Sequence, residues 1–340
     1  MNDALELNFA DWEKIFLDMN EPKFRAKQVC EWIYAKKTFE YESMTNLSKA
    51  LREKLPGEIF ISMPILIKQQ NSRDGTRKYL WQLNDGKRIE SVLINHGGHK
   101  TACISSQVGC ALGCVFCATG TLGLTRNLTK SEILGQFLTM EKLNSGDINN
   151  IVFMGMGEPL LNERNVFDAI KILNDKRMRN LGARHITIST SGIVPGIEDL
   201  ADFEIPLRLS VSLHATNDNL RAKLMPNVSK MYSLQKLVDA LRHYKSRTGE
   251  RITIEYALID RVNDDAQYAY ELAALLDGLE PYVNLIPFNA IPSRPDLKRS
   301  SESRIKNFCA ALRELRIEFE LRKEKGSDIM AACGQLAASK

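Results

Sequence analysis

The sequence lacks any apolar run long enough to span a bilayer, and its first residues lack the basic and apolar regions of a signal peptide. It also lacks low-complexity tracts and short-period repeats. Its seven cysteines are an odd number, which argues against a secreted disulfide framework. We therefore expect a cytoplasmic globular protein with no membrane partner.

No large excess of charge of one sign is present. Lys plus Arg total 46 and Asp plus Glu total 42, so the formal net charge is +4. This balance permits a nucleic-acid partner without requiring one, because the clustering of charges decides such binding. The 340 residues, 44% of them hydrophobic, can form one large domain and a small one.

Three cysteines lie close together in the middle of the chain, with no fourth cysteine nearby. Cys110, Cys114 and Cys117 have the spacing C-x3-C-x2-C. Iron–sulfur clusters normally have four thiolate ligands, so three would leave one iron of a 4Fe–4S cluster open. The spacing is typical of radical S-adenosylmethionine (SAM) enzymes, in which the open iron binds the amino and carboxylate groups of SAM.

A zinc site is the alternative reading of the same cysteines. Three cysteines and a histidine can hold zinc, but His96 and His99 precede the three cysteines and the next histidine is His185. Zinc would imply a non-catalytic, zinc-stabilised RNA-binding protein, whereas the spacing favours an iron–sulfur cluster.

The first 60 residues have a helical apolar pattern and carry several basic side chains. These charges can simply form a solvated helix surface, and composition alone favours that interpretation. The functional interpretation is a module that contacts phosphates. The basic residues are Lys23, Arg25, Lys27, Lys36, Lys37, Lys49 and Arg52.

A β-hairpin is predicted next, at 78–83 and 88–94, because Asn84, Asp85 and Gly86 between these runs form a strong turn sequence. Glu90 would share a strand face with apolar residues. A carboxylate there either faces water at an edge or is a functional group with a raised pKa.

Beyond residue 99, β-branched runs alternate with amphipathic stretches of helical length. This alternation predicts a parallel sheet with right-handed crossovers, in an α/β partial (βα)6 barrel. The predicted strands are 151–154, 185–189, 208–213, 251–259, 283–287 and 317–321, and the predicted helices are 130–143, 165–174, 233–244, 265–276 and 301–315.

Polar residues follow several of these strands, where parallel α/β folds bind their ligands. Gly157 and Glu158 follow the first strand, and Ser189 ends the second. The third closes on 212–214, and Asn289 follows the fifth. We expect these residues and the cysteines to face one mouth of the barrel.

Segments spread over nearly the whole chain resemble the RlmN/Cfr group of radical SAM RNA methyltransferases. They lie at 24–28 (Phe-Arg-Ala-Lys-Gln), 103–110, 114–120, 155–160, 212–214, 283–289 and 332–336 (Ala-Cys-Gly-Gln-Leu). The resemblance implies a radical SAM barrel at 99–340, a hairpin region at 61–98 and a helical RNA-binding accessory domain at 1–60. It thereby favours the phosphate-contacting interpretation of the basic N-terminal helices.

The implied reaction is methylation of carbon 2 of an adenosine in the peptidyl-transferase region of 23S rRNA, and of one beside the anticodon in tRNAs. The segment 283–289 is more similar to RlmN than to Cfr, which methylates carbon 8 and is the alternative. Met330 departs from the acidic residue of many relatives. A reducing electron donor such as flavodoxin is the further implied partner.

The resemblance also implies a role for each site residue. Cys333 takes a methyl group from one SAM, and a second SAM is cleaved at the cluster to a radical that activates that methyl group. Cys103 then releases the product by forming a transient disulfide with Cys333, and Glu90 is the proton acceptor. The implied SAM-binding residues are Gly157, Glu158, Ser189, Ser212, Leu213, His214 and Asn289, and the implied cluster ligands are Cys110, Cys114 and Cys117.

Overall fold

The computed structural model of the protein describes residues 1–144, 146 and 148–338. Its N-terminal part is helical, as the apolar pattern predicts. Asn8 begins the first helix with a capping box, in which its side chain and that of Asp11 each accept the other's backbone N–H. The helices are α1 (Phe9–Asp18), α2 (Phe24–Cys30), which continues as a π-helical turn (Glu31–Ala35), and α3 (Lys49–Glu58).

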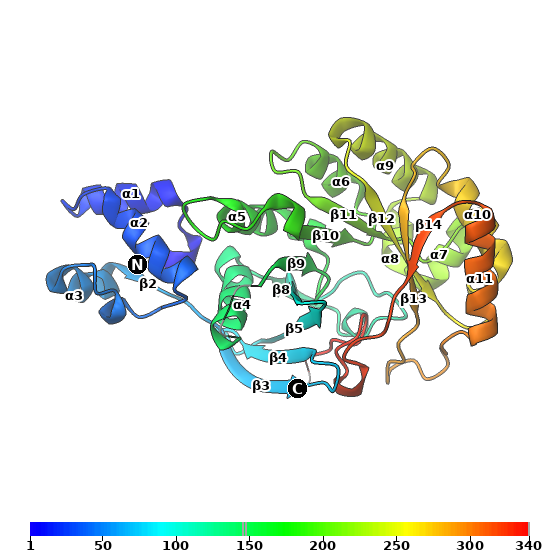
Figure 1. Ribbon diagram of the computed structural model, residues 1–340, viewed down its shortest axis with the longest axis horizontal. Helices are drawn as coiled ribbons and strands as arrows, with labels where there is room; N and C mark the ends of the chain where they lie inside the picture. The colour runs from blue at the N-terminus through cyan, green and yellow to red at the C-terminus, as the bar shows by residue number, and fades with distance from the viewer. Residues whose placement is uncertain (145, 147, 339–340) are drawn as a thin grey trace.

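These N-terminal helices lie beside α4 (Lys130–Leu143) and α5 (Glu163–Asn174) at one end of the molecule (Figure 1). Glu6 accepts the backbone N–H of Ser131 at 2.7 Å, at the start of α4. The short strands β1 (Asn2–Asp3) and β2 (Ile59–Phe60) pair in parallel and close the N-terminal part.

One ten-stranded mixed sheet forms the rest of the fold, in the order β14-β13-β12-β11-β10-β9-β6-β5-β4-β3. Neighbours from β6 to β14 pair in parallel, and those from β3 to β6 pair antiparallel. The strands are β3 (Ile65–Asn71), β4 (Arg77–Gln82), β5 (Arg88–His96), β6 (His99–Cys103), β9 (Asn150–Phe153), β10 (Ile186–Thr190), β11 (Arg208–Ser212), β12 (Ile252–Leu258), β13 (Tyr282–Pro287) and β14 (Glu318–Leu321).

The six predicted parallel strands are all present, which confirms the α/β partial barrel. Helices cover the outside of the curved sheet (Figure 1). The predicted hairpin is β4 and β5, which pair antiparallel and continue the same sheet. The remaining helices are α6 (Val194–Ala201), α7 (Asp218–Leu224), α8 (Pro226–Met231), α9 (Leu234–Thr248), α10 (Ala266–Leu275) and α11 (Glu302–Glu314).

A small two-stranded sheet flanks the loop that carries the three clustered cysteines. β7 (Gln107–Gly109) pairs antiparallel with β8 (Leu124–Asn127), so the chain between them forms a closed loop. Cys110 begins that loop with a backbone hydrogen bond to Gly123, at 2.9 Å. Among the described residues, no helix is both long enough and apolar enough to cross a membrane.

Candidate active site

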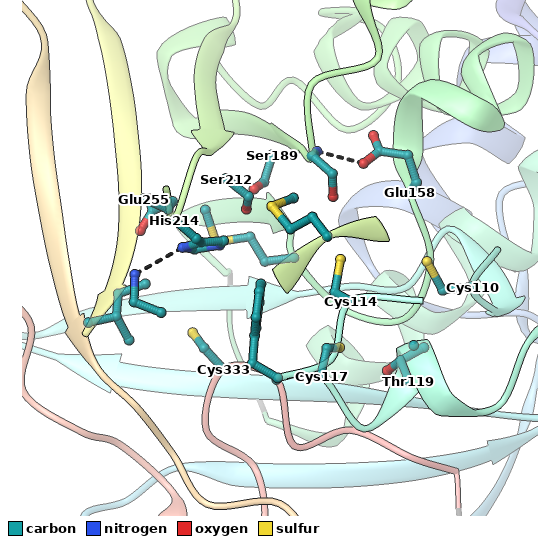
Figure 2. Close-up of a pocket in the computed structure, with 18 of the residues that line it drawn as sticks. Cys110, Cys114, Cys117, Thr119, Glu158, Ser189, Ser212, His214, Glu255 and Cys333 are labelled. Atoms are coloured by element: carbon teal, nitrogen blue, oxygen red, sulfur yellow. Dashed lines mark hydrogen bonds between the residues drawn. The ribbon is translucent and has the colours of Figure 1, made fainter. Parts of the chain in front are cut away.

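The three clustered cysteines lie on a loop, residues 110–117, that is fixed to the helices following β11. We call it the cysteine loop. The Val115 N–H donates to the Leu224 carbonyl at 3.0 Å, and the Asn227 side chain donates to the Ala111 carbonyl at 2.7 Å. These bonds join the loop to the end of α7 and to α8, and the three cysteines line one cavity (Figure 2).

The chemistry of these three thiols fits an iron–sulfur cluster. Burial raises the pKa of Cys110 to about 12 and raises those of Cys114 and Cys117. They therefore need bound cations to become thiolates, which coordination to iron provides. Among the described residues, no three Cys, His, Asp or Glu side chains form a group that could hold a single metal ion. A 4Fe–4S cluster does not need one, because each of its thiolate ligands binds a different iron.

The same cavity brings together most of the residues expected to bind SAM. They come from the loops and ends of β9, β10, β11 and β13, at the carboxyl edge of the sheet. The expected residues that line it are Gly157, Glu158, Ser189, Ser212, His214 and Asn289. Leu213 is fully buried and is not among the lining residues; its backbone N–H donates to the Glu255 carbonyl at 3.1 Å.

Gly157 must be glycine for two reasons. Its φ is +100°, a conformation that L side chains rarely adopt. A Cβ atom there would also lie 2.5 Å from Cβ of Gln107, which is too close for any ordinary contact. Gly157 therefore lets the chain after β9 pass close to the strand that leads into the cysteine loop.

Glu158 is a buried carboxylate that fixes the next strand end. Its Oε2 accepts the Ser191 N–H at 2.7 Å (Figure 2), and its Oε1 accepts the Leu160 N–H at 3.1 Å. Burial raises its pKa, and these hydrogen bonds oppose the shift. The carboxylate thus holds β9 and β10 together at the cavity wall.

His214 is neutral. Its Nδ1 accepts the Ala257 N–H at 2.9 Å, so Nε2 carries the ring proton (Figure 2). Burial lowers its pKa to about 3, and the charge of Arg221 acts in the same direction. The ring also packs edge-on against Phe116 of the cysteine loop, with centroids 4.7 Å apart. His214 therefore supplies one fixed N–H donor beside the loop.

Cys333 enters the cavity from the last part of the chain. Residues 326–338, which we call the C-terminal segment, follow β14 and lie against β4, β5 and Ala118, the residue that follows the cysteine loop. The Cys333 carbonyl accepts from Nδ2 of Asn289 at 3.1 Å, and the Gly334 carbonyl accepts the Ala118 N–H at 2.7 Å. Cys333 is solvent-accessible through the cavity, although surrounding protein raises its thiol pKa, as does the Glu255 carboxylate.

The side-chain oxygen of Asn289 has no hydrogen-bond partner among the described residues, in contrast to its Nδ2. The side chain itself is buried. An unsatisfied buried acceptor in a cavity wall is costly unless a ligand donates to it. This atom fits the SAM-binding role expected of Asn289.

Glu90 is buried but does not line the cavity. Its Oε2 accepts the N–H groups of Ala337 and Ala338, at 2.8 and 3.1 Å, and its Oε1 lies 3.4 Å from Nζ of Lys78. Nζ of Lys78 also donates to the Met330 carbonyl, at 3.1 Å. Glu90 and Lys78 together therefore hold the C-terminal segment on both sides of Cys333.

Cys103 ends β6 and is also buried outside the cavity lining. Burial raises its thiol pKa, and the nearby Cys333 raises it further. Both are free thiols in this structure. Cys30 and Cys309 are buried thiols on α2 and α11, away from the cavity lining.

Several residues of the cavity wall were not predicted from the sequence. Glu255 is buried on β12, where Ser210 and Asn284 both donate to its Oε1, at 2.6 and 2.9 Å. A carboxylate inside an apolar strand is the same pattern that indicated Glu90, so it could have been found. Phe116 and Thr119, in contrast, give no such indication in the sequence.

The sequence matches two known families and is similar to known proteins over its whole length. Residues 104–273 match the family described as "Radical SAM superfamily" and residues 3–61 match "Ribosomal RNA large subunit methyltransferase N-terminal domain". The chain is 48% identical to a "Probable dual-specificity RNA methyltransferase RlmN" of Thermosipho melanesiensis, covering 100% of this chain and 99% of that one. It is 44% identical to a protein of the same name from Staphylococcus aureus, covering 98% and 92%.

A solved structure is also similar over its whole length. The crystal structure of a radical SAM methyltransferase from Sphaerobacter thermophilus superposes with a TM-score of 0.95 at 42% sequence identity, covering 100% of both chains. The similarity therefore includes the barrel, the N-terminal helices and the C-terminal segment.

Proposed function

This chain belongs to the RlmN family of radical SAM RNA methyltransferases, and we propose that it methylates carbon 2 of adenosine. The proposed substrates are an adenosine in the peptidyl-transferase region of 23S rRNA and one beside the anticodon of tRNAs. The words "dual-specificity" in the names of its relatives support two RNA substrates. Membership of the radical SAM superfamily implies a 4Fe–4S cluster and SAM.

Radical chemistry suits this target because carbon 2 of adenine lies between two ring nitrogens and is electron-poor. It cannot displace a methyl group from SAM as an ordinary nucleophile does. When bound, the cluster and SAM supply a radical that removes hydrogen from an unactivated methyl group. The chain itself must then present that methyl group, move protons and exclude water.

Cys333 is the proposed methyl carrier, and its position in the cavity with the three clustered thiols is the observation that carries the proposal. Its Sγ takes the methyl group of one SAM by displacement, and loses its own proton. A second SAM serves the radical step, so two are used per turnover. The Asn289 side chain orients Cys333 through its carbonyl.

Two buried groups complete the proposed reaction. Cys103, as a thiolate, attacks the Cys333 sulfur: the disulfide bond forms as the carbon–sulfur bond to the RNA breaks, and the released carbon takes up a proton to become the methyl group. Glu90 accepts the proton lost by the adenine ring. Its carboxylate now binds Ala337 and Ala338, so the C-terminal segment must release it before it can act on RNA.

The other site residues have binding roles in this proposal. Cys110, Cys114 and Cys117 ligate the cluster, which leaves one iron for SAM. The residues that would hold SAM are Gly157, Glu158, Ser189, Ser212, Leu213, His214 and Asn289. Leu213 could contribute only through its backbone, since its side chain is buried outside the cavity lining.

The proposed division of the chain is residues 1–60 for RNA binding, 61–98 as the hairpin region and 99–340 as the radical SAM core. Lys23, Lys27 and Lys49 are exposed on the N-terminal helices, where they could reach phosphates. We place the enzyme in the cytoplasm with its RNA substrates, with flavodoxin or a similar protein as electron donor.

Mass spectrometry of the modified nucleoside tests the proposal. Anaerobic reaction with 23S rRNA should give 2-methyladenosine, and Cys333→Ala should give none while its iron and sulfide content equals that of wild type. A product methylated at carbon 8 would support the Cfr-like alternative. Loss of iron in Cys333→Ala would make Cys333 a fourth ligand and overturn the carrier role. A colourless protein with stoichiometric zinc would overturn the whole proposal.

A further inference from the structure

Arg221 is a fully buried arginine beside the cysteine loop, and it has no role in the reaction described so far. It lies on α7, one turn before Leu224, whose carbonyl accepts the Val115 N–H. Its Nη2 donates to the Ser191 carbonyl at 2.6 Å. Its Nε and Nη1 are buried without a hydrogen-bond partner among the described residues.

The fold leaves space for this guanidinium group. Gly192, with φ +98°, follows the carbonyl that Arg221 binds, and a Cβ atom there would lie 2.9 Å from Nη2. Glycine at 192 therefore lets the guanidinium pack directly against the turn after β10. Ser191, in the same turn, lines the cavity that holds the three thiols.

Among the described residues, no carboxylate forms a salt bridge with Arg221. Asp218 lies on the same helix, and its Oδ1 already accepts the Leu234 N–H at 2.8 Å. Burial lowers the pKa of Arg221 to about 10, against the opposing charges of Cys114 and Asp218, so the group stays charged at neutral pH.

A buried charge with unsatisfied donors is expensive, because it loses its hydration and gains no partner. Such a group is expected only where something negative occupies the adjacent space. The helix that carries Arg221 also accepts the N–H of Val115, the residue after the proposed cluster ligand Cys114, and the charges of Arg221 and Cys114 influence one another. Three thiolates on a 4Fe–4S cluster give it net negative charge, which one-electron reduction increases.

We propose that Arg221 is the counter-charge of the iron–sulfur cluster, placed next to Cys114 to favour the reduced state. This inference rests on the proposed function for the presence of the cluster. Net charge and hydrogen bonds to sulfur are the main protein controls on the potential of such clusters. A buried positive charge acts through a low dielectric, so its effect is large for its distance.

Three variants of the full-length protein, loaded anaerobically with iron and sulfide, test the inference. Arg221→Met removes the charge and keeps an unbranched side chain, and Arg221→Lys keeps the charge. Arg247→Met is the matched control, because Arg247 is an exposed arginine whose Nε pairs with Asp202 at 2.9 Å, so the same charge is lost far from the cavity. The measurement is the midpoint potential of the cluster, followed by its visible and paramagnetic resonance spectra.

Arg221→Met should make the cluster at least tenfold harder to reduce, which is a shift of about 59 mV to more negative potential for one electron. Arg221→Lys should retain most of the wild-type potential, and Arg247→Met should equal it. Loss of bound iron in Arg221→Met alone, with iron kept in Arg221→Lys, would also support a charge requirement.

An unchanged potential in Arg221→Met would overturn the inference. If that variant instead lost only affinity for SAM, Arg221 would be an anchor for the SAM carboxylate, which equally overturns it. A lost far-UV circular dichroism spectrum in both Arg221 variants would make the residue structural. Failure of the wild-type protein to bind iron and sulfide would overturn the proposed function as well, so the two failures are distinguishable.

Discussion

The cysteine loop and the C-terminal segment bring their thiols to the same cavity, yet the fold holds them by different means. The loop is closed by the pairing of β7 with β8 and is bonded to α7 and α8. The C-terminal segment has no pairing in a sheet. Side chains hold much of it: Asp74 accepts the Gly326 N–H, Glu90 accepts the Ala337 N–H, and Lys78 donates to the Met330 carbonyl.

The difference matches what each region must do in the proposed reaction. A cluster needs three thiolates at fixed positions, so its loop gains from rigid packing. Cys333 must meet SAM, then RNA, then Cys103, so its segment must move between them. The C-terminal segment is held by separate hydrogen bonds and not by strand pairing, so we expect it to open locally without unfolding the sheet.

The largest expected effect comes from removing one thiol of the rigid region. Cys114→Ala should abolish cluster binding and all cleavage of SAM to 5′-deoxyadenosine, while the fold remains intact. Cys309→Ala is the matched control, because Cys309 is another buried thiol but lies on α11 outside the cavity. Iron and sulfide assays with product chromatography check both. Continued formation of 5′-deoxyadenosine by Cys114→Ala would refute the ligand assignment.

A smaller effect is expected at His214, which packs against Phe116 of the loop. Its pKa is about 3 in the folded protein and about 6.5 when unfolded. Below pH 6.5 His214 is therefore protonated in the unfolded chain but stays neutral in the native state. Stability should fall by about 1.4 kcal/mol per pH unit towards pH 3 from this group alone.

His214→Asn should flatten that acid dependence. Asparagine tolerates the positive φ of +57° at this position and can still accept the Ala257 N–H. Denaturant unfolding at pH 6.5, 5.8 and 5.0, on wild type and variant, measures the two slopes. Equal slopes would show that His214 is not buried neutral.

The smallest effect is expected where one hydrogen bond that holds the C-terminal segment is weakened. Asp74 accepts the Gly326 N–H at 2.9 Å from the turn before β4. Asp74→Asn should weaken this partly buried, charge-assisted bond by about 1 kcal/mol, which corresponds to roughly fivefold faster proteolysis of the C-terminal segment. Iron content should not change. A variant that loses iron would show that the two regions are not held independently.

The regular part of the fold could be predicted from the sequence because its periodic patterns are long. Helix α4 begins and ends as predicted, since Thr129 and Glu132 form a capping box at its start. Strand β3 was missed because it is an edge strand whose residues, such as Ile65 and Lys68, are mostly exposed. Helices α7 and α8 were missed because each has fewer than eight residues and little periodicity.

The site divides in the same way. Because ligands bind at the carboxyl ends of parallel strands, Glu158, Ser189 and His214 were predicted to lie near the clustered cysteines. All of them line one cavity. Cys333 and Cys103 could be suggested only by resemblance, because no local pattern places a C-terminal thiol at the mouth of a barrel. The arrangement of Glu90 was not predictable either, since its partners Ala337 and Ala338 contribute only backbone N–H groups.

The most direct test of the account follows the two thiols together. If the transferred carbon stays attached to the Cys333 sulfur until Cys103 attacks, Cys103→Ala should stop the reaction after carbon–carbon bond formation. A denaturing gel should then show a covalent protein–RNA adduct that nuclease trims to one nucleotide on the Cys333 peptide. Cys103→Ala combined with Cys333→Ala should show no adduct. Normal turnover by Cys103→Ala, with no adduct, would contradict the roles of both thiols.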